Sequence, residues 1–388
     1  MPGTTPACRG QKTADDELTN AVRERAKHLN AQPSRSTPIC RDRARRMENS
    51  ADSFVRYRAA LPSARAAQDM NELGNAKSAP VTQPCLRRLP LDAAGLNQAL
   101  GIPPGSPTAI KEGQLINDTT GFRAAVYQSQ SDGRYILVPR DTQPDSLVDW
   151  QTNINNGQDE DPDQYKEMRE LTGRLAQNPV PFDIGGYSKG GGLAQEGGLM
   201  SSASQVYVFN SAGLSSDSLT RTKQSSFDDL ASRTTAFSSQ GDFLTYMNNT
   251  TDPAQQIRNA EYLRAELGAK PGYLHPLAIT HRNPESLDGK LDPKFAGDRE
   301  TFLKQLDDLI AKRRANPDGP PPFPPVRARS ESIIPNSMSS LGGNLQALND
   351  GPNLGKLAQH RISSVVGPME AQVNLTRGNF ETFLKECG

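Results

Sequence analysis

The 388-residue sequence is poor in apolar side chains and has no long apolar run. Hydrophobic residues make up 35% of the chain and aromatic residues 6%, whereas there are 32 glycines and 30 prolines. This composition supplies one core but not 388 well-packed residues, so we expect long irregular or disordered stretches. No run of about eighteen apolar residues is present, so we expect no membrane-spanning helix.

Neither sign of charge is in excess, because 44 basic residues balance 44 acidic residues. A net charge of zero gives no overall field that would attract nucleic acid, so we expect no nucleic-acid partner. Cysteine is also scarce. The four cysteines are scattered without metal-ligand spacing or an evident disulfide framework, so we expect reduced thiols and no metal site built from cysteines. They are Cys8, Cys40, Cys85 and Cys387.

Residues 1–20 lack the apolar segment of a secretory signal. We therefore expect a protein that is made in the cytoplasm without a cleavable signal peptide. Export to a target cell would then need a dedicated secretion system.

Two regions of different composition divide the chain. Residues 1–80 are polar and rich in arginine and alanine, and they predict a helical or partly disordered leader with helices near 14–29 and 52–73. Residues 81–388 predict the catalytic domain, with a Gly/Pro-rich helical insertion at 250–355.

Strands and helices alternate in the middle of the chain. Asp132 and Gly133 lie between two apolar runs and predict a hairpin turn. The expected strands are 121–130, 134–139, 180–184, 205–210, 233–238 and 326–334, and the expected helices are 163–177, 190–200, 227–230 and 359–374. Strand and helix alternation of this kind predicts an α/β-hydrolase-like, mostly parallel sheet with helices on both faces.

The segment Gly186-Tyr187-Ser188-Lys189-Gly190 has the pattern G-x-S-x-G, and it lies between a predicted strand and a predicted helix. In this context a serine is held on a sharp turn at the edge of a sheet, where its hydroxyl can act as a nucleophile. We therefore predict Ser188 as the catalytic nucleophile. The alternative is a surface serine in a glycine-rich loop.

An oxyanion requires backbone N–H donors beside the nucleophile. Lys189 follows the serine and is the first expected donor. The second should come from the loop after strand 134–139, where Thr142 or Asp141 would donate; an ordinary turn is the alternative.

The acid of a triad should follow a strand downstream of the serine. Asp242 follows strand 233–238 and meets this condition. The rivals Asp217, Asp228 and Asp229 precede that strand. A turn aspartate without a catalytic role remains the alternative for Asp242.

The base should be a histidine after the acid, and two candidates remain open. His360 lies between a loop-like stretch and the last predicted helix, whereas His281 ends a plausible strand. Position favours His360, with His281 as the alternative base.

Residues 121–247 resemble the lipase class 3 group of α/β-hydrolases, and in particular bacterial lipase and phospholipase effectors. The elbow is similar to the G-H-S-K-G-G form of that group, with Tyr187 in place of histidine, and Asp141 stands where these proteins often have glycine. The closing segment around His360 is similar to the group's last His-plus-helix element. The stretches that carry the resemblance are GFRAAVYQSQSDGRYILVPRDT, PDSLVDWQTNINNGQ, DIGGYSKGGGLA, VYVFNSAGL, TTAFSSQGDFLTYM and GKLAQHRISSVVGPMEAQV.

The resemblance implies a toxin that hydrolyses carboxylic esters of glycerophospholipids or acylglycerols at a membrane surface, with no metal and no other cofactor. Effectors of this kind are made in a bacterial cytoplasm and paired with an immunity protein. Separately, the position and polar composition of residues 1–80 suggest a secretion or adaptor-docking region. The sequence leaves two other functions open. One is a nonlipolytic esterase or acyltransferase with the same triad, and the other is an inactive hydrolase fold used as a binding module.

Overall fold

The computed structural model describes twelve stretches of the chain and some single positions between them. The stretches are residues 5–32, 36–73, 84–90, 109–111, 113–142, 161–177, 181–201, 203–214, 224–239, 310–317, 329–333 and 362–388. The predicted bases His281 and His360 lie outside these residues, as does most of the predicted insertion.

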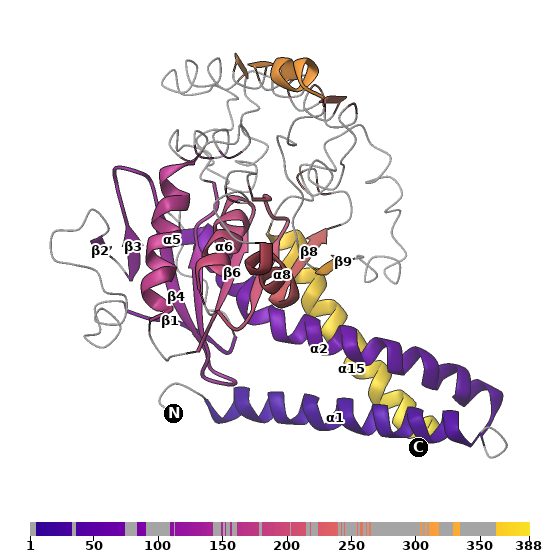
Figure 1. Ribbon diagram of the computed structural model, residues 1–388. Helices are drawn as coiled ribbons and strands as arrows, with labels where there is room; N and C mark the ends of the chain where they lie inside the picture. Colours follow the sequence, from indigo (N-terminus) through magenta and orange to yellow (C-terminus); the bar gives the residue numbers. More distant parts are fainter. Residues whose placement is uncertain are drawn as a thin grey trace, which may run out of the picture.

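The described strands form one mixed sheet with the order β2-β3-β4-β5-β6-β7-β8-β9, and β1 pairs with β4 (Figure 1). Neighbours from β5 to β9 are parallel, whereas β1 to β4 add antiparallel pairs at one side. The predicted α/β fold with a parallel sheet is therefore confirmed. The strands are β1 Leu86–Arg88, β2 Ala109–Lys111, β3 Gln114–Ile116, β4 Arg123–Ser129, β5 Tyr135–Pro139, β6 Phe182–Tyr187, β7 Val206–Phe209, β8 Thr234–Ser239 and β9 Arg329–Ile333.

The predicted hairpin joins β4 to β5. Gln128 pairs with Tyr135, and Gly133 takes a φ of 79° in the turn between them. That conformation favours glycine because a side chain would be strained there. The Asp-Gly signal in the sequence thus located the turn correctly.

Helices cover both faces of the sheet, as predicted. α5 and α6 share a buried cluster with one face of β4 to β7, and α1, α2 and α15 share a second cluster with the opposite face. Figure 1 shows α1, α2 and α15 lying alongside one another in an arm that extends from the sheet. The helices are α1 Pro6–Ala31, α2 Pro38–Leu73, α5 Asp163–Leu175, α6 Lys189–Met200, α8 Gln224–Arg233 and α15 Ser363–Cys387.

The residues of β4 alternate between these two clusters. Ala125 and Tyr127 pack toward α2, whereas Ala124 and Val126 pack toward α5 and α6. This is the period of two expected for a strand that is buried on both faces. Both faces of β4 are therefore part of a hydrophobic core.

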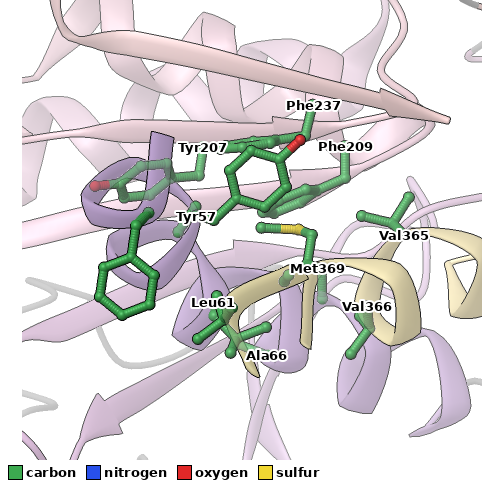
Figure 2. Close-up of a cluster of buried hydrophobic side chains, with 14 of the residues drawn as sticks. Tyr57, Leu61, Ala66, Tyr207, Phe209, Phe237, Val365, Val366 and Met369 are labelled. Atoms are coloured by element: carbon green, nitrogen blue, oxygen red, sulfur yellow. The ribbon is translucent and has the colours of Figure 1, made fainter. Parts of the chain in front are cut away.

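The face covered by α2 holds the larger aromatic side chains. Figure 2 shows Tyr57 of α2 and Met369 of α15 pointing toward Phe209 and Phe237 of the sheet. The ring centroids of Tyr57 and Phe237 are 5.4 Å apart in an edge-to-face arrangement. Three elements from distant parts of the sequence therefore meet in one core.

The helical N-terminus is confirmed, but its helices are longer than predicted and pack on the sheet. A Cβ atom placed on Gly185 of β6 would lie 2.9 Å from Cβ of Ser63, so α2 approaches the strand closely. The division into a leader of residues 1–80 and a catalytic domain of residues 81–388 stays a prediction. The hydrophobic cluster itself crosses that boundary.

The expectation of four reduced cysteines is wrong. Disulfides join Cys8 to Cys85 and Cys40 to Cys387. The partners are 77 and 347 residues apart, so spacing along the sequence gave no sign of either pair. The second bond connects the start of α2 to the end of α15.

The last helix also differs from its prediction. α15 starts at Ser363, continues through Pro368 and ends at Cys387, whereas the predicted helix covered residues 359–374. Packing of Val365, Val366 and Met369 on the core stabilises this turn of the helix. No helix within the described residues is long and apolar enough to cross a bilayer.

Candidate active site

Ser188 lies on the turn between β6 and α6. Its φ of 53° and ψ of −125° place a non-glycine residue in a region that L-residues rarely adopt. The serine is the N-cap residue of α6, and 8% of its surface is exposed. This strained strand–turn–helix geometry is the one that the G-x-S-x-G pattern requires for a nucleophile.

The two glycines of the motif allow this sharp turn. A Cβ atom on Gly186 would overlap the carbonyl oxygen of Gly190. A Cβ atom on Gly190 would lie 2.6 Å from the carbonyl oxygen of Pro139 at the end of β5. Side chains at either position would therefore push the serine turn away from its neighbouring strand.

Backbone hydrogen bonds fix the turn against β7. The N–H of Ser188 donates to the carbonyl oxygen of Phe209 at 3.0 Å, and the carbonyl oxygen of Ser188 accepts from the N–H of Ala212 at 2.9 Å. Lys189 is the first residue of α6, where a backbone N–H has no carbonyl partner within the helix. This position suits an oxyanion donor.

The side chain of Lys189 is buried beneath the turn. Its Nζ contacts Oδ1 of Asp149 and donates to Oε1 of Gln164 at 2.8 Å. Oδ1 of Asp149 also accepts a hydrogen bond from Nε2 of Gln164 at 2.8 Å, and its Oδ2 lies 3.8 Å from Nη2 of Arg140. A buried polar group thus connects the start of α6, helix α5 and the residue after β5.

Neighbouring positive charges favour the ionised form of the Asp149 carboxyl. Burial alone would raise the pKa of the Asp149 carboxyl, but the charges of Lys189 and Arg140 hold it below its usual value. Removal of one partner would leave an uncompensated buried charge, which is strongly destabilising.

The loop after β5 packs against the serine turn. Thr142 and Asp141 are both buried, and the backbone nitrogen of Asp141 would lie 3.3 Å from a Cβ atom on Gly190. The loop therefore reaches the first turn of α6, where a second oxyanion donor is needed. Which of the two residues would donate stays a prediction.

The carboxyl of Asp141 is itself unusual. Burial raises its pKa to about 6, against the opposing effects of Asn71, Arg140 and Lys189. Nδ2 of Asn71 donates to Oδ2 of Asp141 at 2.5 Å. An α2 residue therefore contacts the loop that faces the serine.

Asp242 lies after β8 at the same edge of the sheet as Ser188. It is buried, and its N–H donates to the carbonyl oxygen of Ser239 at 3.0 Å. Because β6, β7 and β8 are parallel neighbours, the residues that follow them gather at one edge. This placement fits the acid of a triad, although its role stays a prediction.

Two rivals for the acid are less suitable. Asp228 and Asp229 are exposed on α8, and Oδ2 of Asp229 accepts from Nε of Arg233 at 2.8 Å. Asp217 lies outside the described residues. A complete Ser–His–Asp arrangement is thus not visible, because both candidate histidines are undescribed.

Sequence reasoning missed the side chains that support the turn. Asp149, Gln164 and Asn71 belong to no recognisable sequence motif. For Lys189, the sequence predicted a role only for the backbone N–H, as an oxyanion donor. A lysine directly after a nucleophilic serine, with acidic residues in the preceding segment, was the one available signal. Within the described residues, no group of histidine, cysteine or acidic side chains could hold a metal ion.

The α/β sheet and the serine turn together define an α/β-hydrolase-like protein. Residues 98–273 match a family model described as a Tle-like phospholipase domain within the phospholipase-like group. The match spans 176 of the 388 residues and includes Ser188 and Asp242. The resemblance to bacterial lipase and phospholipase effectors is confirmed, and with it a function of the phospholipase type in general terms. No curated protein matches the chain.

Proposed function

We propose that the protein is a serine-dependent carboxylic ester hydrolase, a phospholipase A that acts on membrane glycerolipids. The observation that carries the proposal is the strained conformation of Ser188 on the turn from β6 to α6. The same turn lies inside the region that matches a phospholipase domain.

The proposed reaction has two steps. The hydroxyl oxygen of Ser188 attacks the acyl carbonyl while the histidine accepts its proton, and backbone N–H groups of Lys189 and Thr142 stabilise the oxyanion. The histidine then protonates the leaving alcohol, which departs as a lysophospholipid. Water, activated by the same histidine, attacks the acyl ester and releases a fatty acid and free Ser188.

His360 is the favoured base. It precedes Ile362 by two residues in the sequence, and Ile362 is buried in the same cluster as Phe237 of β8. Asp242 follows β8 by three residues. His281 is kept as the alternative base.

We also propose that the protein acts after export, as an antibacterial effector at a membrane surface. The family match supports this role, and so do the two disulfides, because such bonds persist in oxidising compartments such as the bacterial periplasm. An immunity protein in the producing cell and a secretion adaptor are the expected partners.

The first test compares fatty acid release from phospholipid vesicles by the wild-type protein, Ser188→Ala and Ser201→Ala. Ser201 is a matched control, because it is as buried as Ser188 but lies at the opposite end of α6. Release by the wild type and the control, but not by Ser188→Ala, is the expected result. Cleavage of short-chain esters alone would favour a nonlipolytic esterase, and inactivity on both substrates would favour a binding module.

The remaining triad members are tested in the same assay. Asp242→Asn should reduce kcat by roughly 10³–10⁴-fold, as loss of the orienting acid does in serine hydrolases. Asp229→Asn, at the exposed rival, should leave kcat unchanged. A comparable loss in His360→Ala but not in His281→Ala would assign the base, and the opposite pattern would assign it to His281.

A further inference from the structure

The last turn of α2 makes two polar contacts, one with strand β4 and one with the loop after β5. The hydroxyl of Tyr127 on β4 donates to Oδ2 of Asp69 at 2.7 Å. Two residues later, Nδ2 of Asn71 donates to Oδ2 of Asp141 at 2.5 Å. All four residues are buried, so these contacts are shielded from solvent.

The loop that Asn71 contacts lies between two anchors. On the side of α6, Arg140 is near Asp149, which contacts Lys189. On the opposite side, Asn71 reaches the carboxyl of Asp141. The backbone of this loop packs against Gly190, within the first turn after Ser188.

Asn71 also favours the charged form of the carboxyl that it contacts. Burial raises the pKa of Asp141, and the hydrogen bond from Asn71 is the largest effect that opposes the rise. Without this donor the pKa of Asp141 would rise further, so the neutral carboxylic acid would persist to a higher pH.

We infer that Asn71 is a positioning residue for the proposed hydrolase, because it holds the Asp141 carboxylate and thereby fixes the loop whose backbone faces the serine turn. This inference rests on the proposed function. Asn71 touches neither substrate nor reacting atoms in this role, and it acts through Asp141. The N-terminal region then supports the proposed active site from outside it, and is not only a leader.

The test measures kcat, KM and their pH dependence with a soluble short-chain ester for the wild-type protein, Asn71→Leu and Gln68→Ala. Leucine matches the size of asparagine but cannot donate. Gln68 is the matched control, because it lies one turn earlier on α2 and its Nε2 donates to Glu72 instead. Asn71→Leu should lower kcat roughly tenfold with KM changed less than about twofold, whereas Gln68→Ala should match the wild type.

The pH profile separates this role from a loss of packing. In Asn71→Leu the acidic limb of kcat should move to higher pH, because Asp141 becomes harder to ionise. In an Asp141→Asn background the substitution Asn71→Leu should not move that limb, since only the histidine then titrates. A shift of equal size in both backgrounds would overturn the inference.

Other outcomes are also decisive. If Ser188→Ala is inactive and Asn71→Leu keeps the wild-type kcat and pH profile, the inference fails while the proposed function stands. If Ser188→Ala stays active, the proposed function fails. In that case NMR of the Asp141 carboxyl carbon measures the pKa of this residue in the wild type and in Asn71→Leu. The comparison decides whether Asn71 controls the charge of Asp141. Asn71→Ala replaces the leucine variant throughout if the latter does not fold.

Discussion

Ser188 keeps its backbone conformation at a cost in free energy. A non-glycine residue at this φ and ψ is strained by about 1–3 kcal/mol, which the surrounding hydrogen bonds must offset. The bonds from Ser188 to Phe209 and Ala212 are part of that compensation. The strain is thus stored at the residue proposed to react.

This strain predicts a difference between two inactive variants. Ser188→Gly and Ser188→Ala both remove the hydroxyl, but only glycine adopts the observed conformation without strain. We expect Ser188→Gly to unfold at a higher urea concentration, with a free energy of unfolding about 1–2 kcal/mol above that of Ser188→Ala. Equal stabilities of the two variants would show that the turn is not strained.

The raised pKa of Asp141 predicts a pH dependence of stability. Because burial places the folded pKa near 6 and the ordinary value is 3.8, the folded protein holds a proton that the unfolded chain releases. The contribution of this group to stability is complete below about pH 4 and is lost as the pH rises through 6.

Asp141→Asn removes this titration. Relative to the wild type, the variant should gain on the order of 1–3 kcal/mol in free energy of unfolding between pH 4 and pH 7.5, since each pKa unit corresponds to about 1.4 kcal/mol. Urea titrations of both proteins at the two pH values measure the change. A difference that does not vary with pH would contradict the assignment.

At the scale of elements, α2 is the helix that links the N-terminal arm to the sheet. It covers the sheet face that carries Phe209 and Phe237 (Figure 2), and it contacts β6 through Ser63 and Gly185. A helix in this position is needed to bury an apolar sheet surface.

Deletion of residues 1–80 tests this dependence and the predicted domain boundary together. We expect the truncated chain to expose the apolar sheet face, bind a hydrophobic dye and lose its near-UV circular dichroism signal. The full-length protein provides the reference. A truncated protein that melts cooperatively and keeps its activity would show that the leader is a separate region.

The sequence revealed elements whose patterns are local. The hairpin was identified from the neighbouring residues Asp132 and Gly133. The serine turn was identified from the apolar run before Ser188 and the glycines after it. Strands β1 to β3 have three residues each, too few to show a period of two. The docking of α2 was hidden because alanines, such as Ala60, Ala64 and Ala67, form a close-packing surface without a strong apolar pattern.

The supporting side chains of the site could not be predicted for a related reason. Lys189 meets Asp149 and Gln164 from residues 40 and 25 positions away, and Asn71 meets Asp141 across 70 positions. These contacts exist only after the sheet has formed. The sequence shows which residues carry charge, but not which of them become buried together.

At the scale of the whole molecule, the disulfides connect distant regions of the chain. Cys40 and Cys387 join the start of α2 to the end of α15, and Cys8 and Cys85 join α1 to the residue before β1. Such long loops lose much conformational freedom in the unfolded state when they are closed.

Loss of the longer bond should therefore lower stability without altering the sheet. We expect Cys40→Ser/Cys387→Ser to reduce the free energy of unfolding by roughly 2–5 kcal/mol, as measured by urea titration under oxidising conditions. The wild-type protein in excess reductant should approach the same value or fall below it, since both bonds are then broken. A double variant as stable as the oxidised wild type would exclude a stabilising role.

The Cys40–Cys387 bond also limits how the chain can be threaded through a pore. Once this bond has formed, 347 positions separate its two ends, and nearly the whole polypeptide is a closed ring. A closed ring can enter a channel only with two strands side by side. A channel that is one extended strand wide therefore cannot admit it. Passage in single file therefore requires that this bond form only after the chain has crossed, whereas a wider conduit could carry the protein already folded and oxidised.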